Sequence, residues 1–421
     1  MRRIYTFLFY LLAPFILIRL YWKGRRLPEY RHRIKERFML TTGETLKVDA
    51  WLHAVSLGEV VAAIPLIDAM IAKGWRVLIT TMTPTGSEKV KSRFGDKVLH
   101  QYVPYDYPWV LRRFFKRYAI NVAVIMETEL WPNLIHFAHT NKIPLLLVNA
   151  RISDQAFGKY EKVKFFFKPI LANFTGIMTQ SDEDAARFIA LGAPSNLVSV
   201  SGNIKFDLQI KVPNLTVFQE IKEQWGASRT VVLAASTHEG EESQLLSAFS
   251  QLKTAIPGVL FAIAPRHPER FQTIYNLCQQ MGFNTGLRSQ AATINSDIDM
   301  IVLDSMGELL GFYQISDFAF VGGSLVPLIG GHNVLEPIAV EVPVFTGPHM
   351  QNSKSICQDL CAMNAMQLYT NAEDIFAAMI RMHQDKSSRV QQVSNASQVL
   401  EKNKGSLGRY LEKIEEVVQT A

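Results

Sequence analysis

From about residue 48 onward the chain alternates short, strongly apolar runs with longer helical patterns, and this alternation constrains its fold more than any other feature. The apolar runs have the length and near-continuous hydrophobicity of buried parallel strands. In the first half they read DAWLHAVS, WRVLITTM, NVAVIMETE, PLLLVNARI, TGIMTQS and VSVSGN. Helical segments such as EVVAAIPLIDAMIAKG separate them. This order predicts a doubly wound α/β sheet.

The alternation occurs twice, which predicts two domains. A weak boundary falls at Asp207 to Thr216, and the pattern then restarts with TVVLAAST, VLFAIAPRH, DMIVLDS, DFAFVGGS and VPVFTGP. We therefore expect an N-terminal α/β domain over 38–210 and a C-terminal α/β domain over 217–421. Sheets of this kind bind ligands beyond the carboxyl ends of their strands, so the two Rossmann-like domains are expected to face each other across a cleft.

Residues 1–37 differ in composition from the rest of the chain. Residues 4–18 are uncharged and would rise about 22 Å as a helix, less than the roughly 30 Å of a bilayer core, and Pro14 would kink that helix. Residues 1–37 also hold ten Lys or Arg and two Glu. We expect a membrane anchor whose basic residues lie on anionic lipid; a signal peptide and a buried core helix are the alternatives. Nucleic acid is not an expected partner, because an aromatic, apolar block has no role in tracking phosphates.

The polar residues that follow the strands of the first domain are candidates for chemistry. Glu59 follows the first strand and opens a helix, where it is either a carboxylate that stabilises the helix dipole or a general base for a substrate hydroxyl. Glu127 and Glu129 follow another strand, and Lys205 follows the last strand of this domain. Lys205 is able to meet a phosphate or a carboxylate, and the alternative is a solvated surface lysine.

The second domain carries the motifs suited to a nucleotide. Arg266 follows a strand and is suited to a phosphate or a base edge. The glycine runs at 322–323 and 330–331 are predicted to cradle phosphate through backbone amides, and Glu336 is placed to accept ribose hydroxyls. Asp297-x-Asp299 precedes a strand, so we interpret it as a turn and expect no metal site. Three cysteines are too few for a disulfide framework and fit a reducing cytosol.

These runs together resemble one family, the Kdo transferases, which add 3-deoxy-D-manno-octulosonic acid (Kdo) to lipid A precursors. The matching stretches include SLGEVVAAIPL, TTMTPTGSE, IMETELWPNLI, SGNIKFD, STHEGEE, APRHPERF, FVGGSLV and GGHNVLEP. The resemblance implies a GT-B fold and an inverting transfer from CMP-Kdo, a co-substrate, with no cofactor and no metal. It implies lipid IVA as the acceptor, in lipopolysaccharide inner-core biosynthesis at the cytoplasmic face of the inner membrane.

The resemblance also assigns roles to residues. It implies that Glu59 is the general base and that Glu129 and Lys205 stabilise the transition state. It places the cytidine nucleotide against Pro265, Arg266, Met306, Gly307, Glu308, Asn333, Val334, Leu335 and Glu336. A two-domain nucleotide-sugar epimerase and a catalytically silent, membrane-bound relative remain as alternatives.

Overall fold

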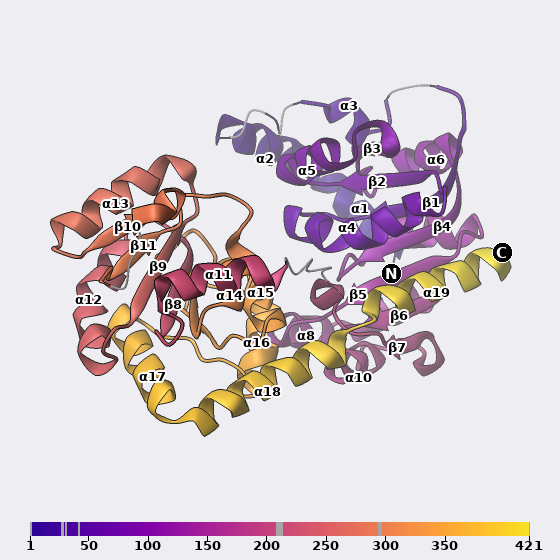
Figure 1. Ribbon diagram of the computed structural model, residues 1–421. Coiled ribbons are helices and arrows are strands. Elements are labelled where there is room, and N and C mark those ends of the chain that lie inside the picture. Colours follow the sequence, from indigo (N-terminus) through magenta and orange to yellow (C-terminus); the bar gives the residue numbers. More distant parts are fainter. Residues whose placement is uncertain are drawn as a thin grey trace. The chain divides into compact units, whose positions relative to one another are not determined.

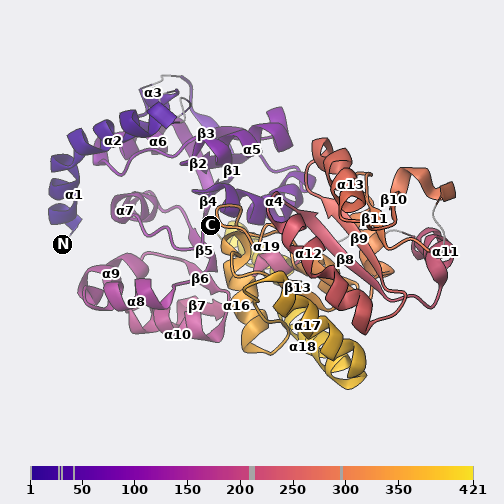
Figure 2. The same ribbon diagram turned by 90° about the vertical axis from the view of Figure 1, so that its left-hand side faces the viewer.

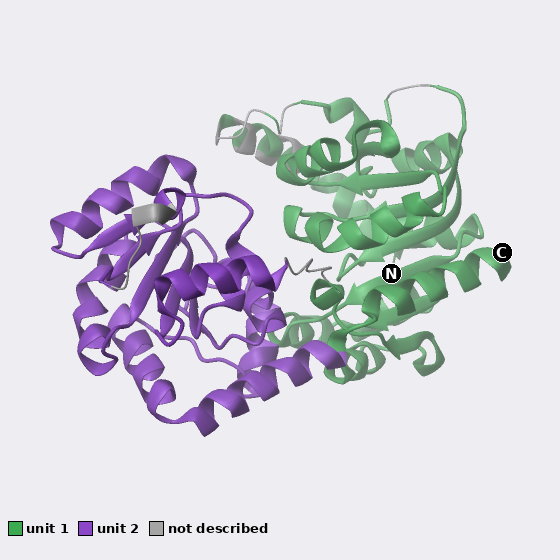
Figure 3. Cartoon of the chain, viewed as in Figure 1, with its two compact units in different colours: residues 1–208, 403–421 green, residues 209–402 purple. Residues whose placement is uncertain are grey.

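The chain folds into two compact units, each built around its own parallel sheet (Figures 1 and 3). The computed structural model describes residues 2–26, 29, 32–40, 43–207, 214–293 and 297–420. Unit 1 comprises Met1–Leu208 and Asn403–Ala421, and unit 2 comprises Gln209–Lys402. The predicted pair of doubly wound α/β domains is confirmed.

The sheet of unit 1 has seven parallel strands in the order β3-β2-β1-β4-β5-β6-β7. Their bounds are β1 Leu46–His53, β2 Val77–Thr81, β3 Leu99–Tyr102, β4 Tyr118–Met126, β5 Leu145–Ala150, β6 Gly176–Thr179 and β7 Val198–Val200. Every residue of β2 and β5 is buried, because helices cover both faces of the sheet. This burial explains why the strands read as continuous apolar runs instead of alternating ones.

Helices cover each face of this sheet (Figure 2). The unit 1 helices are α4 Leu57–Ala72, α5 Pro84–Phe94, α6 Pro108–Arg117, α7 Pro132–Thr140, α8 Asp154–Glu161, α9 Lys164–Leu171, α10 Asp182–Ala190 and α19 Ser406–Thr420. Trp51 packs in one core with side chains of α6, α7 and α9. Its neighbour Leu52 points to the opposite face and packs in a second core with side chains of α4, α5 and α19.

The last helix belongs to unit 1, and this differs from the predicted C-terminal domain over 217–421. Tyr410 and Ile414 of α19 are fully buried in the core that also holds Leu66 of α4. The Tyr410 hydroxyl donates a hydrogen bond to the Gly202 carbonyl. The long, polar α18 (Lys386–Asn403) precedes α19 and leads the chain back. The predicted boundary falls mostly on residues 208–213, outside the described residues.

Unit 2 has a six-stranded parallel sheet in the order β10-β11-β9-β8-β12-β13. The strands are β8 Val231–Thr237, β9 Leu260–Pro265, β10 Thr285–Leu287, β11 Met300–Val302, β12 Phe318–Val321 and β13 Val344–Thr346. The helices are α11 Leu215–Gly226, α12 Glu241–Ala255, α13 Phe271–Gln280, α14 Leu309–Gln314, α15 Leu335–Ala339, α16 Lys354–Ala362, α17 Ala372–Gln384 and α18. Side chains of α12, α13 and α17 pack on one face of the sheet, and side chains of α11 and α14 pack on the other.

Short 3-10 helices complete both units. They are η2 Gly95–Lys97, η3 Ser195–Leu197, η4 Ile204–Asp207, η5 Pro268–Arg270, η6 Arg288–Thr293 and η7 Gln351–Ser353.

The predicted anchor forms three helices, α1 Arg2–Leu11, α2 Ala13–Arg26 and α3 Ile34–Arg37. None of the described helices is by itself long and apolar enough to cross a membrane. Only α1 taken together with Ala13–Trp22 satisfies that test, and the two are bent by 52° at their junction. No residue of α1 is buried, so the alternative of a buried core helix does not apply to it. Residues 1, 27, 28, 30 and 31 of the predicted basic segment lie outside the described residues.

Among the described residues, ten exposed large apolar side chains lie on α1 and α2 or between them. They are Ile4, Phe7, Leu8, Tyr10, Leu11, Leu12, Phe15, Ile18, Tyr21 and Trp22, each between 44% and 68% exposed. The helix α1 is held on unit 1 through Asn133 of α7, whose Oδ1 accepts hydrogen bonds from Arg2 and Thr6, each at 3.0 Å. We call these ten exposed side chains the apolar patch, since exposed apolar surface of this kind contacts lipid or protein.

Candidate active site

Glu59 sits in the first turn of α4, immediately beyond β1, and the residue is 8% exposed. Its Oε2 accepts a hydrogen bond from the Val55 N–H at 2.8 Å, and its Oε1 accepts one from the Ser56 hydroxyl at 2.8 Å. The Glu59 N–H donates back to Ser56 Oγ at 3.3 Å. Glu59 and Ser56 therefore cap α4 reciprocally. This contact agrees with the first of the two alternatives for Glu59, a carboxylate that stabilises the start of the helix.

The electrostatics of Glu59 go beyond capping. Burial raises its pKa to about 7, and the nearby charges of Glu127 and Glu129 act in the same direction, against the hydrogen bonds from Val55 and Ser56. A base works best when its pKa lies near the working pH, because it is then both deprotonated and able to hold a proton. Each carboxylate oxygen has two lone pairs, so the two capping bonds leave room for a substrate hydroxyl. The same carboxylate can cap the helix and act as a base.

Glu127 and Lys205 form an ion pair beside this carboxylate. Lys205 lies in η4, beyond β7, and its Nζ is 3.6 Å from Glu127 Oε1. Glu127 directly follows β4 and has a φ of 56°. This value lies in the left-handed region that few residues other than Gly, Asn and Asp adopt. Strained backbone of this kind is found at functional sites, where it aims a side chain. The family resemblance assigned no role to Glu127. In the sequence, Glu127 stood out only because it lies two residues from a second carboxylate, Glu129.

Glu129 has a different environment from Glu127. Its Oε2 accepts a hydrogen bond from the Trp131 indole at 2.7 Å. Burial raises the pKa of Glu129, and that hydrogen bond opposes the shift. Glu127 and Glu129 therefore lie near Glu59, and Lys205 pairs with Glu127, all beyond the carboxyl ends of unit 1 strands.

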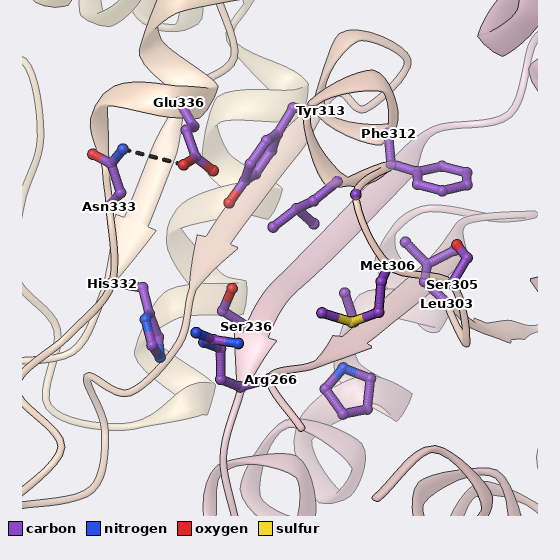
Figure 4. A pocket seen from close by; sticks show the side chains of 14 residues that line it. Ser236, Arg266, Leu303, Ser305, Met306, Phe312, Tyr313, His332, Asn333 and Glu336 are labelled. Atoms are coloured by element: carbon purple, nitrogen blue, oxygen red, sulfur yellow. Dashed lines mark hydrogen bonds between the residues drawn. The ribbon is translucent and has the colours of Figure 1, made fainter. Parts of the chain in front are cut away.

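A cavity of about 300 Å³ lies beyond the strands of unit 2 (Figure 4). It brings together six of the residues predicted for the nucleotide, namely Pro265, Arg266, Met306, Gly307, Asn333 and Glu336. It also contains Ser236, Tyr313 and His332, which the sequence did not assign to the nucleotide. Figure 4 shows Glu336 and Asn333 toward one end and Arg266 with His332 toward the other. A carboxylate at one end and an arginine at the other suit the hydroxyls and the phosphate of a nucleotide.

Three of the predicted nucleotide residues are not among the described side chains that line this cavity. Glu308 instead forms an ion pair with Arg288 at 3.3 Å and accepts a hydrogen bond from the Ser305 hydroxyl. Val334 and Leu335 are buried in unit 2, at 0% and 1% exposure. Glu336, in contrast, is held by Asn333, whose Nδ2 donates to Glu336 Oε1 at 3.2 Å, while burial raises the Glu336 pKa.

His332 stacks against His238, with ring centroids 5.0 Å apart and the two Nε2 atoms 2.8 Å apart. Burial, together with the neighbouring His238, Arg266 and His267, lowers the pKa of His332 to about 4. His332 is therefore neutral at pH 7, and an anion bound beside it would raise its pKa again.

For the first glycine run the prediction of a phosphate cradle is wrong. The backbone N–H groups of Gly323, Ser324 and Leu325 donate to the carboxylate of Glu241 at 2.7, 2.8 and 2.8 Å. The Glu241 side chain is fully buried, and the N–H of His238 donates to it as well, at 3.0 Å. A carboxylate of the protein thus already occupies this set of amides.

Asp299 of the Asp-x-Asp pair is bound to other parts of unit 2. Its Oδ1 pairs with Lys253 at 2.6 Å, and its Oδ2 accepts a hydrogen bond from the Asn284 N–H at 3.2 Å. Among the described residues no group of three or more His, Cys, Asp or Glu side chains is arranged to hold a metal ion.

Comparison with known proteins identifies the family. Residues 32–208 match the family described as 3-deoxy-D-manno-octulosonic-acid transferase (kdotransferase). A 3-deoxy-D-manno-octulosonic acid transferase from Haemophilus influenzae is 36% identical over 98% of this chain and 97% of its own, and one from Bordetella pertussis is 34% identical over 86% and 87%. A glycosyltransferase crystal structure from Rickettsia africae covers 89% of this chain and 100% of its own with a TM-score of 0.52 and 14% identity, which shows a shared fold. The chain belongs to the 3-deoxy-D-manno-octulosonic acid transferase family.

Proposed function

We propose that this chain is an inverting glycosyltransferase that moves Kdo from CMP-Kdo onto lipid IVA in lipopolysaccharide inner-core biosynthesis. Family membership supports the transfer of Kdo. The observation that carries the mechanism is Glu59, a buried carboxylate whose pKa is raised to about 7 among two further carboxylates and a lysine. We expect CMP-Kdo to be a co-substrate and the reaction to need no cofactor.

The proposed step transfers one proton and exchanges one bond. Glu59 accepts the proton of a sugar hydroxyl on the acceptor, and the hydroxyl oxygen forms a bond to the anomeric carbon of Kdo from the face opposite the phosphate. The bond between that carbon and the phosphate oxygen breaks, and CMP leaves with the electron pair. The products are neutral Glu59, the glycoside with inverted configuration, and CMP carrying one more negative charge. A general base of this kind contributes roughly 10² to 10⁴ in rate.

The charges of each unit suit one part of this reaction. Lys205 supplies a cation near Glu59, where it offsets the negative charge of Glu127 at a distance of 3.6 Å. In unit 2 the donor's phosphate is expected beside Arg266 and His332, and its ribose beside Glu336. Preorganised charges stabilise a transition state because they need not reorient as its charge develops.

We infer that the protein works at the cytoplasmic face of the inner membrane. The apolar patch on α1 and α2 is exposed, and burial of such a surface in lipid is favourable. Arg2, Arg3 and Arg25 lie on these two helices, where basic side chains gain from anionic headgroups. The membrane also holds the lipid acceptor, so the patch brings unit 1 and its substrate to the same surface.

Mass spectrometry tests the proposal directly. The full chain is incubated in vesicles with CMP-Kdo and tetraacylated lipid IVA, and the molecular mass of the lipid is then measured. A gain of one or two Kdo units is expected and also gives the number transferred. An epimerase would instead convert a soluble sugar nucleotide without lipid, and a silent relative would bind CMP-Kdo without turnover. Either result refutes the proposal.

A further inference from the structure

A second cavity, of about 610 Å³, lies in unit 1 between the N-terminal helices and the loop that carries Glu129. Small-molecule sites typically enclose roughly 300 to 1,000 Å³. Most of its wall is apolar and includes Tyr5, Phe9, Leu20, Trp131, Phe166 and Phe167. These residues come from α1, α2, α7's entry loop and α9, so the cavity exists only when the N-terminal helices are packed on unit 1. We call it the α1 cavity.

Three charged side chains in its wall, Asp106, Glu129 and Arg37, bind other parts of the protein. Both Asp106 oxygens accept backbone N–H bonds, from Asn133 at 3.0 Å and from Leu134 at 2.7 Å. Glu129 accepts the Trp131 indole N–H, as described above. Arg37 donates to the Met82 carbonyl at 2.8 Å. An occupant therefore meets chiefly rings and aliphatic carbon.

The position of the cavity links lipid to the candidate base. Phe9 of α1 lines the cavity, whereas Phe7 of the same helix is 68% exposed on the outer patch. The helix α1 therefore borders both the cavity and the outer patch.

Thr83 also lines the cavity. The Thr83 hydroxyl donates to the Val55 carbonyl at 3.4 Å, and the N–H of Val55 holds Glu59. Glu129 also belongs to the cavity wall. Two residues of the wall, Thr83 and Glu129, thus connect the cavity to Glu59, the proposed base.

We propose that the α1 cavity binds one acyl chain of the lipid acceptor and thereby holds the acceptor's sugar beside Glu59. This inference rests on the proposed function and adds a site for the lipid part of the substrate. Each buried methylene is worth roughly fourfold in affinity, so the enzyme is expected to prefer acceptors with long acyl chains.

Two tryptophan variants on one helix provide the test. Leu20→Trp adds a large side chain at a position that is 8% exposed and lines the cavity, whereas Ile18→Trp adds the same side chain at a position that is 56% exposed. The assay measures kcat/KM for long-chain and short-chain forms of the same acceptor, with the full chain in vesicles. We expect Leu20→Trp to reduce the preference for the long chain about tenfold or more, and Ile18→Trp to keep it.

The outcomes separate the two proposals. If wild type transfers Kdo but shows no chain-length preference, or if Leu20→Trp lowers both acceptors equally, the acyl-chain site is refuted while the transferase stands. If wild type transfers nothing, the proposed function itself fails. Residual turnover of the short-chain acceptor shows that Leu20→Trp is folded.

Crosslinking distinguishes the acceptor from ordinary lipid. A photoreactive group at the end of the acceptor's acyl chain is expected to label the segment that contains Phe166 and Phe167. Labelling of the same segment by a photoreactive phospholipid that excess acceptor does not displace would assign the cavity to structural lipid and overturn the inference.

Discussion

Replacing Glu59 by glutamine separates the two roles that its carboxylate combines. The pKa of about 7, against an ordinary 4.5, means that the folded protein holds this proton more tightly than the unfolded chain. At pH 8 the buried charge therefore costs the fold about 3 kcal/mol, from roughly 2.5 pKa units at 1.36 kcal/mol each. Glutamine removes this charge. It keeps one acceptor oxygen but places an NH₂ group opposite the second hydrogen-bond donor, which then has no acceptor. Part of the stability gained by removing the charge is therefore lost.

We therefore expect Glu59→Gln to lower kcat by about 10² to 10⁴ while the free energy of unfolding at pH 8 stays equal or rises by up to about 3 kcal/mol. The free energy of unfolding of wild type falls as pH rises from 4.5 to 7, because a carboxylate with a raised pKa binds its proton more tightly in the folded state. The stability advantage of the variant should disappear below about pH 4.5, where wild type is also protonated. In wild type, kcat/KM should rise with pH and level off above about 7, because the base must be deprotonated.

The assay pairs Kdo transfer with denaturant unfolding at pH 4.5 and pH 8. The matched control is Glu88→Gln, which makes the same change at an exposed position of α5 in the same unit and should alter neither quantity. A carboxylate that only caps α4 predicts the reverse for Glu59→Gln, with stability reduced by about 1 kcal/mol and turnover near normal. That outcome would falsify the assignment of the base.

Three further predictions concern the neighbours of these sites. Glu127→Gln removes a negative charge that raises the Glu59 pKa, so the midpoint of the pH–rate curve should move to lower pH; an unchanged midpoint would mean that Glu127 does not act on the base. Glu241→Ala leaves the buried amides of Gly323, Ser324 and Leu325 without their acceptor, and chemical denaturation should show a loss of at least about 3 kcal/mol; a small loss would contradict this account of the glycine loop. Glu336→Gln should weaken CMP binding about tenfold in calorimetry, whereas Glu269→Gln, whose side chain is 75% exposed, should not; equal affinities would remove the ribose role.

The sequence predicted six of the seven strands of unit 1, because strands buried on both faces read as continuous apolar runs. It missed β3, whose sequence LHQY is largely polar. Glu59 follows the buried end of β1, so its place beyond a strand end could be inferred. Its pKa could not, because the shift comes from desolvation and from Glu127 and Glu129, which lie some 70 residues along the chain.

Contacts between distant segments account for what the sequence did not predict. The amides of the first glycine run bind Glu241, about 80 residues earlier, and no local pattern distinguishes such a loop from one that is free to bind phosphate. In α19 the buried residues Tyr410, Ile414 and Val417 are spaced by four and three. That spacing says that the helix packs against something, but not that it packs on unit 1.

The return of α19 to unit 1 has a consequence for how the protein is made. A ribosome completes the first 208 residues of unit 1 well before it reaches residue 403, where the second segment of this unit begins. At typical elongation rates the interval is about 10 to 40 s. During that time one face of the first sheet lacks α19, whose Tyr410 packs in the same core as Leu66 and Ile67. The nascent domain therefore exposes an incomplete core until the second unit has been synthesised, and a chaperone that binds apolar surface would find its target in this interval.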